Sequence, residues 1–318
     1  MKTVEKIYYT FTKANPPSAF AGDGEIIRFI ASDCYGWNGE SNVPVFNSEK
    51  LNGATGPVSV EGAMPGDILA VDILDVSIGR KGFLHCSKGC GPLGDVAKDR
   101  LRVIDVIGDE ILFNETRWKV EPMIGVIGVA PGKDAISNCL SGTHGGNMDC
   151  RLITKGVTVY FPVRAEGALL SLGDFHASMG DGEVCGTGIE IQGEAVARVR
   201  VLKKTALEWP LVETADAWHV VTSGDSFEDA VTSASHELRR LLAAAWRWDA
   251  SDIYMYLSAR GAIGVNQCVF PCSNVQYSVR FSVPKELSKS HLLSAPKKKN
   301  DDDMIRYLES MRTKAKRI

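Results

Sequence analysis

The sequence predicts a mainly β fold, with a β-sandwich or β-barrel body followed by a smaller C-terminal α+β part. Short apolar runs alternate with Gly, Pro, Asp and Asn as far as about residue 210, and the 31 glycines suit sharp corners between strands. Helical apolar spacing begins only after about residue 222. We therefore divide the chain into a body at 1–210, which carries the functional site, and an α+β segment at 211–318 with a helical tail.

Six apolar runs in the body have the length and composition of strands. Turn signals such as the PGD sequence at 65–67 and the PGK sequence at 131–133 separate them. Their partly polar alternation is typical of half-buried strands. The predicted strands are 26–30, 58–60, 68–76, 111–113, 157–162 and 195–202.

A long helix is predicted after residue 225. Asp225 and Ser226 can cap its N-terminus, and an acidic residue such as Glu228 is favourable in the first turn. Apolar residues then recur at helical spacing and form one stripe. The stripe consists of Phe227, Ala230, Val231, Ala234, Leu238, Leu241, Leu242 and Ala245.

Three further segments complete the C-terminal part. A second helix is predicted from Ser251 to about Arg260, and it stops at Gly261. Alternation returns at 276–283 and indicates a strand, and after a polar linker an amphipathic helix is predicted from Asp302.

Charge and hydropathy exclude several functions. The formal net charge is −3, so there is no excess of Lys and Arg to neutralise phosphates, and we expect no nucleic-acid partner. No stretch approaches the ~20 apolar residues that span a bilayer, so we expect no membrane partner. The N-terminus is charged where a secretory signal would be apolar, which predicts a cytoplasmic location.

Eight cysteines are present, and we predict that they are free thiols because the chain is long and apolar enough to fold without disulfides. Cys86 with Cys90, and Cys268 with Cys272, form two CxxxC pairs. Zinc knuckles usually have the tighter CxxC spacing, so these pairs do not indicate a structural metal.

Two segments concentrate groups capable of chemistry. In 142–149 (GTHGGNMD), His144 precedes two glycines, whose backbone can approach a ligand closely, and Asp149 adds a carboxylate. In 171–183 (SLGDFHASMGDGE), Asp174 and His176 would share one face of a strand, and Asp181 and Glu183 follow in a turn. Each segment alone is compatible with an ordinary loop.

Together these segments predict a metal site. Imidazole and carboxylate groups are the usual ligands of zinc, although oxygen-rich sites also suit calcium or magnesium, and the same groups can hold iron or nickel. A bound divalent ion can lower the pKa of water to about 7, and a free carboxylate can then move a proton to a leaving amine. These groups suffice for amide hydrolysis.

A third candidate segment is 32–38 (SDCYGWN), where a predicted strand passes into a loop. Asp33 fits either a functional group or an Asx turn. Cys34 could be a nucleophile, but the sequence places no histidine beside it to activate it.

The chain resembles the acetamidase/formamidase family, and the resemblance extends through most of its length. It rests on the motifs of 142–149 and 171–183 and on several others in the same order. These are NPP at 15–17, GDGEIIRF at 22–29, DCYG at 33–36, GPVSVEGAMPGD at 56–67, ILAVDILDV at 68–76, GALL at 167–170 and the stretch 254–284.

The resemblance implies hydrolysis of a short amide such as formamide or acetamide to the acid and ammonia. It also implies a divalent metal, in the first place zinc, and a homo-oligomer, dimeric or larger. Carried onto this chain, it centres the site on six residues. We assign Asp33, His144 and His176 as metal ligands, Glu183 as general acid/base, and Asp181 and Asp149 to orienting roles or a fourth ligand position.

Two positions depart from the family pattern: Cys34 begins an unexpected CYGWN stretch, and Met179 stands where Gln is common. The acyl group of the substrate is therefore open. Two other functional classes also remain open. One is an amidase with a serine or cysteine nucleophile, and the other is a β-sandwich that binds metal or another ligand without catalysis.

Overall fold

The computed structural model describes residues 1–40, 44–203, 206–272 and 276–293. Within these residues, 19 strands connect into one sheet and two more pair separately. The strands are β1 (Lys2–Val4), β2 (Ile7–Tyr8), β3 (Thr10–Phe11), β4 (Ala19–Ala21), β5 (Ile26–Ala31), β6 (Ala54–Val60), β7 (Ile68–Cys86), β8 (Arg100–Ile107), β9 (Glu110–Phe113), β10 (Thr116–Lys119), β11 (Met123–Gly128), β12 (Ile136–Ser137), β13 (Ser141–Gly142), β14 (Gly145–Asn147), β15 (Thr158–Pro162), β16 (Leu170–His176), β17 (Glu190–Leu202), β18 (Leu211–Glu213), β19 (Ala217–Gly224), β20 (Ala262–Gln267) and β21 (Tyr277–Pro284).

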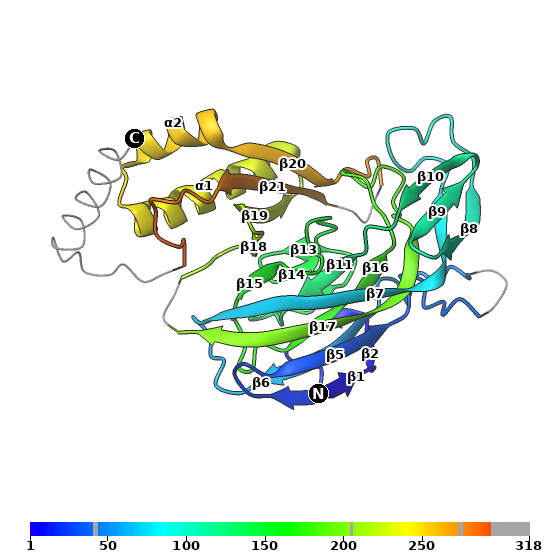
Figure 1. The fold of residues 1–318 in the computed structure, drawn as a ribbon, viewed down its shortest axis with the longest axis horizontal. Coiled ribbons are helices and arrows are strands. Elements are labelled where there is room, and N and C mark those ends of the chain that lie inside the picture. Colours follow the sequence, from blue (N-terminus) through cyan, green and yellow to red (C-terminus); the bar gives the residue numbers. More distant parts are fainter. Residues whose placement is uncertain (41–43, 204–205, 273–275, 294–318) are drawn as a thin grey trace, which may run out of the picture.

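The mainly β prediction is confirmed, and the six predicted strands correspond to β5, β6, β7, β9, β15 and β17. The sheet curls on itself, and the long antiparallel pair β7 and β17 runs along one side of the body (Figure 1). The register of this pair shifts twice, between Ile191 and Gly193 and between Val196 and Ala197. Such irregularities increase local twist and help a long strand pair to bend.

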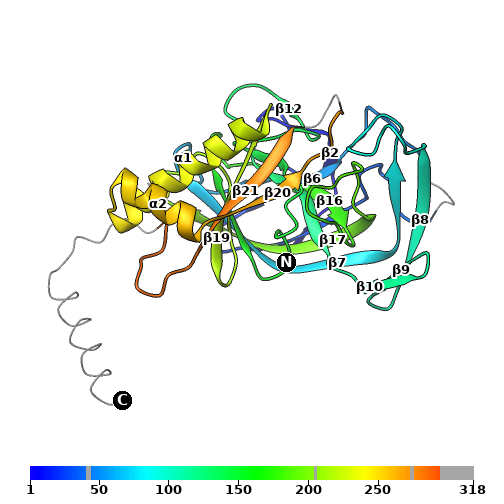
Figure 2. The same ribbon diagram turned by 90° about the horizontal axis from the view of Figure 1, so that it is seen from above.

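The two helices cover the C-terminal strands. Helix α1 (Phe227–Trp246) packs on β19 and β21, and α2 (Ala250–Arg260) follows it. Both predicted helices and the strand predicted at 276–283 are therefore confirmed. Figures 1 and 2 show the helices at one end of the molecule and the β8–β9–β10 ribbon at the other. The helix predicted from Asp302 lies outside the described residues.

The apolar side chains form two main cores. The larger core fills the curled sheet and includes Phe29, Phe161 and Phe175. The second lies between the helices and strands β18, β19 and β21, and includes Leu238 and Leu242 of α1. In the part of the chain described, neither helix combines the length and the apolar character that a membrane crossing needs.

Candidate active site

The end of β16 and the start of β17 form the centre of a buried polar cluster. Antiparallel pairing of the two strands sets His176 opposite Glu190, and the His176 Nε2 atom lies 3.0 Å from Glu190 Oε1. The same nitrogen lies 3.7 Å from Asp174 Oδ1 and 3.8 Å from Glu183 Oε1. Asp174 and His176 therefore serve one site, as their two-residue spacing on a strand predicts.

Asp149, which follows β14, adds a fourth carboxylate. Asp149, His176 and Glu183 each present a ligand atom, and these atoms lie within 4.8 Å of one another. Asp149, Asp174 and Glu183 have φ values of 42°, 57° and 43°, a region that residues other than glycine rarely adopt. Backbone strain of this kind is concentrated at functional sites, where the surrounding fold holds it in place.

A second group of candidate ligands contains the other two carboxylates of the cluster, those of Asp174 and Glu190. Cys34, Asp174 and Glu190 also present ligand atoms within 4.8 Å of one another. Cys34 is held there by the turn after β5, in which the Asp33 carboxylate accepts hydrogen bonds from the backbone N–H groups of Tyr35 (3.0 Å) and Trp37 (2.8 Å). Asp33 thus shapes the turn that positions Cys34.

Gln267, the last residue of β20, connects the C-terminal part to the cluster. Its Nε2 atom donates to Asp149 Oδ2 at 2.7 Å and to Glu183 Oε2 at 3.1 Å. The other Glu183 oxygen accepts from the backbone N–H of Gly188 at 2.9 Å. The register of β20 shifts between Val265 and Gln267, which changes the direction of the strand end. Both segments of the chain therefore build the site.

The cluster is strongly acidic for a buried location. Burial, and then the negative charge of neighbouring carboxylates, raise the pKa values of Asp149 and Glu190 well above their ordinary range. Burial is also the main cause that raises the pKa values of Asp174 and Glu183. Among the described residues that line the adjoining pocket, none is Lys or Arg. The carboxylates must therefore hold protons or share a bound cation.

Several buried atoms in the cluster have no hydrogen-bond partner among the described residues. They are both ring nitrogens of His176, Asp149 Oδ1, Asp174 Oδ1 and Glu190 Oε2. Buried polar atoms are almost always satisfied, so several unsatisfied atoms within one cluster indicate a site for a ligand. One imidazole with several carboxylates is a donor set that fits a divalent metal ion.

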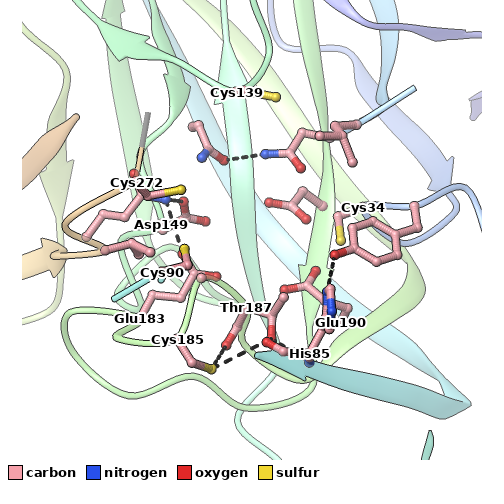
Figure 3. A pocket seen from close by; sticks show the side chains of 18 of the residues that line it. Cys34, His85, Cys90, Cys139, Asp149, Glu183, Cys185, Thr187, Glu190 and Cys272 are labelled. Carbon is pink, nitrogen blue, oxygen red and sulfur yellow. Dashed lines mark hydrogen bonds between the residues drawn. The ribbon is translucent and has the colours of Figure 1, made fainter. Parts of the chain in front are cut away.

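A pocket of about 290 Å³ adjoins the cluster (Figure 3). Asp149, Asp174, Glu183 and Glu190 contribute to its polar side. Three other side chains supply apolar surface, namely Tyr35, Phe46 and Leu51. The volume lies at the lower end of the usual range for small-molecule sites, so the pocket suits a small ligand.

Asn52 and Asn147 add neutral polar groups to the same pocket. Asn52 Nδ2 donates to Asn147 Oδ1 at 3.0 Å, and both residues line the cavity. The pocket thus combines carboxylates, carboxamides and apolar surface, which are the groups needed to orient a small polar molecule with an apolar end.

Three residues predicted for the site from sequence lie outside the two groups of candidate ligands. His144 lies in the β13–β14 turn and is buried against the Phe11 ring, with the ring centroids 5.1 Å apart. Its two ring nitrogens have no hydrogen-bond partner among the described residues, and it belongs to neither ligand group. Burial there lowers the pKa of His144 to about 4. Asp181 is exposed and pairs with Arg280 at 2.7 Å, because it lies on the outer side of its turn. Asp33 supports the Cys34 turn and is absent from both groups of candidate ligands.

The structure does bring Asp149, His176 and Glu183 together, although these residues come from separate loops and strands. Glu190 and Gln267 were missed from sequence. Glu190 had one usable signal, since it is an acid between two isoleucines, Ile189 and Ile191. Gln267 had none, because a glutamine at a strand end is ordinary.

Several known proteins are similar to this chain in sequence. A family model described as the acetamidase/formamidase family matches residues 38–141 and 137–232. The formamidase of Methylophilus methylotrophus is 28% identical over 239 residues, which cover 54% of this chain and 58% of that protein. The chain spans between 53% and 60% of the length of the curated relatives it matches.

Solved structures extend the likeness to most of the chain. A predicted acetamidase/formamidase from Thermoanaerobacter tengcongensis superposes with a TM-score of 0.84 at 36% identity, and the match covers 89% of this chain and 95% of that one. An acetamidase from Bacillus halodurans gives a TM-score of 0.83 at 33% identity, with 89% and 97% covered. Because the family model matches more than half of its residues, the chain belongs to the acetamidase/formamidase family.

Proposed function

We propose that this protein hydrolyses a short aliphatic amide, such as formamide or acetamide, to the carboxylate and ammonia. The observation that carries the proposal is the cluster of Asp149, His176 and Glu183 beside a small pocket in a chain of this family. Relatives named formamidase and acetamidase support the choice of substrate class.

We propose a divalent metal at this cluster. The residues that would hold it are His176, Asp149, Asp174 and Glu190, the members of the cluster that have a buried atom without a hydrogen-bond partner among the described residues. Zinc is our first choice because an imidazole is present, and calcium or another divalent ion also suits the carboxylates. When bound, such an ion supplies Lewis acidity toward a carbonyl and makes water more acidic.

Glu183 is proposed as the general acid/base. Gln267 and Gly188 hold its two oxygens, so the carboxyl group has a fixed direction. Burial raises its pKa, which favours the protonated form of the carboxyl group and so helps it to hold a proton between the two transfers. It takes a proton from water as the water adds to the amide carbon. It then donates the proton to the amide nitrogen as the C–N bond breaks and ammonia leaves.

The pocket residues position the substrate in this proposal. Asn147 can donate through Nδ2 to the amide carbonyl oxygen while Asn52 holds its Oδ1 atom. The apolar surface of Tyr35, Phe46 and Leu51 receives the acyl chain. Because the pocket is small, we expect turnover to fall as the acyl chain lengthens.

A cysteine nucleophile is the second candidate, and one observation favours it. The Cys34 thiol lies within 4.8 Å of a Glu190 carboxylate oxygen, so the structure provides a potential base that the sequence did not reveal. Burial and three nearby acids, however, raise the pKa of Cys34 well above its ordinary value. This environment opposes the thiolate form that attack on a carbonyl requires. The Cys34→Ser variant should therefore keep measurable turnover, and complete loss with metal retained would favour the cysteine mechanism.

The deciding experiment combines elemental analysis with ammonia release from formamide and acetamide, before and after chelation. We expect about one metal ion per chain in the simplest case, with release lost on chelation and restored by zinc. Metal-independent ammonia release would overturn the metal assignment. Metal uptake with no ammonia from either amide would overturn the hydrolase proposal and favour a binding protein.

We also propose a cytoplasmic homo-oligomer, dimeric or larger, with no nucleic-acid partner. The oligomer rests on the family resemblance alone, and the net charge of −3 supports the last point. Light scattering coupled to size exclusion tests the oligomer, since a single mass near 34.5 kDa would contradict it.

A further inference from the structure

Cys34 is a free thiol in the second group of candidate ligands, and the proposed hydrolysis gives it no role. Its sulfur and one carboxylate oxygen each of Asp174 and Glu190 lie within 4.8 Å of one another, and all three residues are buried. Figure 3 shows Cys34 and Glu190 on one side of the pocket, and Asp149 and Glu183 on the other. The cluster therefore offers two distinct groups of ligand atoms.

Two oxygens of this second group lack a partner. Asp174 Oδ1 and Glu190 Oε2 have no hydrogen-bond partner among the described residues, although the two residues are only 3% and 2% exposed. The neighbouring Cys34 thiol does not satisfy them, since it is a weak donor with a single S–H group. Buried carboxylate oxygens are almost always satisfied, and a bound cation would satisfy both of these at once.

The charge of the cluster is also larger than one divalent ion can balance. Asp149, Asp174, Glu183 and Glu190 are four buried carboxylates. Among the described residues that line the pocket, none is Lys or Arg. One divalent ion balances two ionised carboxylates, so the other two need protons or a second cation.

The two groups of ligands adjoin each other. The His176 Nε2 atom of the first group lies 3.0 Å from Glu190 Oε1 and 3.7 Å from Asp174 Oδ1 of the second. A carboxylate has two oxygens, so Asp174 and Glu190 can each face two ions. Centres with two metal ions also occur in several classes of hydrolase.

We propose that Cys34, Asp174 and Glu190 bind a second divalent ion, with the Cys34 sulfur as a thiolate ligand. The inference rests on the metal proposed above but not on amide hydrolysis. A thiolate ligand favours zinc over calcium or magnesium, which prefer oxygen ligands.

The thiolate form depends on the ion. Burial and the nearby acids raise the pKa of the unligated Cys34 thiol. A divalent ion in the group supplies the positive charge that these surroundings lack, and a thiol that coordinates an ion loses its proton. The proton is released to solvent as the metal binds.

The test uses the full-length protein, stripped of metal by a chelator and then given Zn²⁺ or Co²⁺. Elemental analysis after removal of free metal should find about two ions per chain. The Co²⁺ form should show a thiolate-to-cobalt charge-transfer band in the near ultraviolet. Cys34→Ser should abolish this band and lower the count to about one ion. Cys139→Ser is the matched control and should keep both, because Cys139 lines the same pocket but belongs to neither ligand group.

The zinc form allows a measurement that needs no variant. X-ray absorption should show a sulfur neighbour at about 2.3 Å from zinc, and a shell of nitrogen and oxygen alone would contradict the assignment. Two further results would overturn the second site: a single ion with no charge-transfer band in the unaltered protein, or two ions and the band in Cys34→Ser. If the unaltered protein binds no ion, the metal of the proposed function fails as well. Two ions and the band without ammonia release would instead support the second site and refute only the hydrolysis.

Discussion

Asp181 and Glu183 lie two residues apart in one turn but have opposite environments. Asp181 faces solvent and pairs with Arg280, whereas Glu183 is 6% exposed and contacts His176 and Gln267. The chemistry of a carboxylate depends on its surroundings more than on its residue type, because burial changes which protonation state is stable. Variants of these two residues therefore compare a buried with an exposed carboxylate in the same turn.

We predict that Glu183→Gln lowers kcat by about 10²–10⁴-fold, because it removes the proton-transfer group but keeps the shape of the side chain. Ammonia release at saturating acetamide measures the loss. Asp181→Asn is the matched control and should stay within about 3-fold, since an exposed ion pair contributes about 0–1 kcal/mol. Equal losses in both variants would contradict the assignment of Glu183.

Gln267 is a positioning residue in the same network. We predict that Gln267→Met lowers kcat by about 10–100-fold, because two hydrogen bonds that align the carboxylates, each worth about 0.5–1.5 kcal/mol net, are lost while side-chain volume is nearly kept. KM should change less than kcat, since Gln267 aligns the carboxylates rather than the substrate. A rise in KM with unchanged kcat would instead assign Gln267 to substrate binding.

For single residues, the sequence indicates which side chains could take part in chemistry better than it indicates which residues they contact. The dense segments around Asp149 and Glu183 were recognisable because they concentrate carboxylates in loops. His144 was equally conspicuous, yet the fold turns it toward Phe11. Gln267 reaches Asp149 across 118 positions of sequence, and only the pairing of strands determines that contact.

Most features of helix α1 can be predicted from the local sequence pattern, but its C-terminal cap cannot. Most of the predicted stripe is buried, namely Ala230, Ala234, Leu238, Leu241 and Leu242, whereas Phe227 at its start is exposed. Ser226 is the N-cap, as its position suggests. The C-terminal end was less predictable. Arg247 caps the helix with a φ of 58°, a left-handed conformation that usually selects glycine, so composition gave no signal there.

The N-cap gives a stability prediction for this element. Ser226 Oγ accepts a hydrogen bond from the Asp229 backbone N–H at 3.0 Å, so Ser226→Ala should lower the free energy of unfolding by about 1 kcal/mol. Urea denaturation followed by circular dichroism measures the change. Ser235→Ala, on the same helix, is the control. Its hydroxyl donates to the Val231 carbonyl oxygen, and we expect a change below about 0.5 kcal/mol.

At the scale of the whole molecule, Glu213 joins the body to the C-terminal part. It sits in β18, which pairs with β15 of the body and with β19. Burial alone would raise the pKa of Glu213, but hydrogen bonds from His291, Lys285 and Tyr160 outweigh it and hold the value at about 2. A depressed pKa in the folded state means that the ionised carboxylate stabilises the fold.

We predict that this stabilisation is fully present above pH 4.5, the ordinary pKa of the group, and is lost as the pH falls toward 2. After allowance for solvent screening it amounts to about 1–2 kcal/mol. Glu213→Gln should therefore lower the free energy of unfolding at pH 7, and the difference from the unaltered protein should shrink near pH 3. The exposed Glu61→Gln is the control, and a deficit in Glu213→Gln that does not change with pH would refute the ionic account.

The overall architecture was largely predictable because strand and helix periodicities are local signals. The closure of the sheet was not, since it depends on long-range pairs such as β1 with β5 and β4 with β6, both parallel. The division of the chain at residue 210 remains a prediction, although the pocket draws residues from both sides of it.

The contact from Gln267 to Asp149 and Glu183 has a consequence for biogenesis. Contacts between residues far apart in sequence form late, because a long loop must close before they can contribute. A ribosome would release the β16–β17 carboxylates well before it completes β20, so the nascent body would carry its acids without the amide that aligns them. The carboxylates of Asp149 and Glu183 therefore acquire their hydrogen bonds from Gln267 only after β20 has been made and has paired.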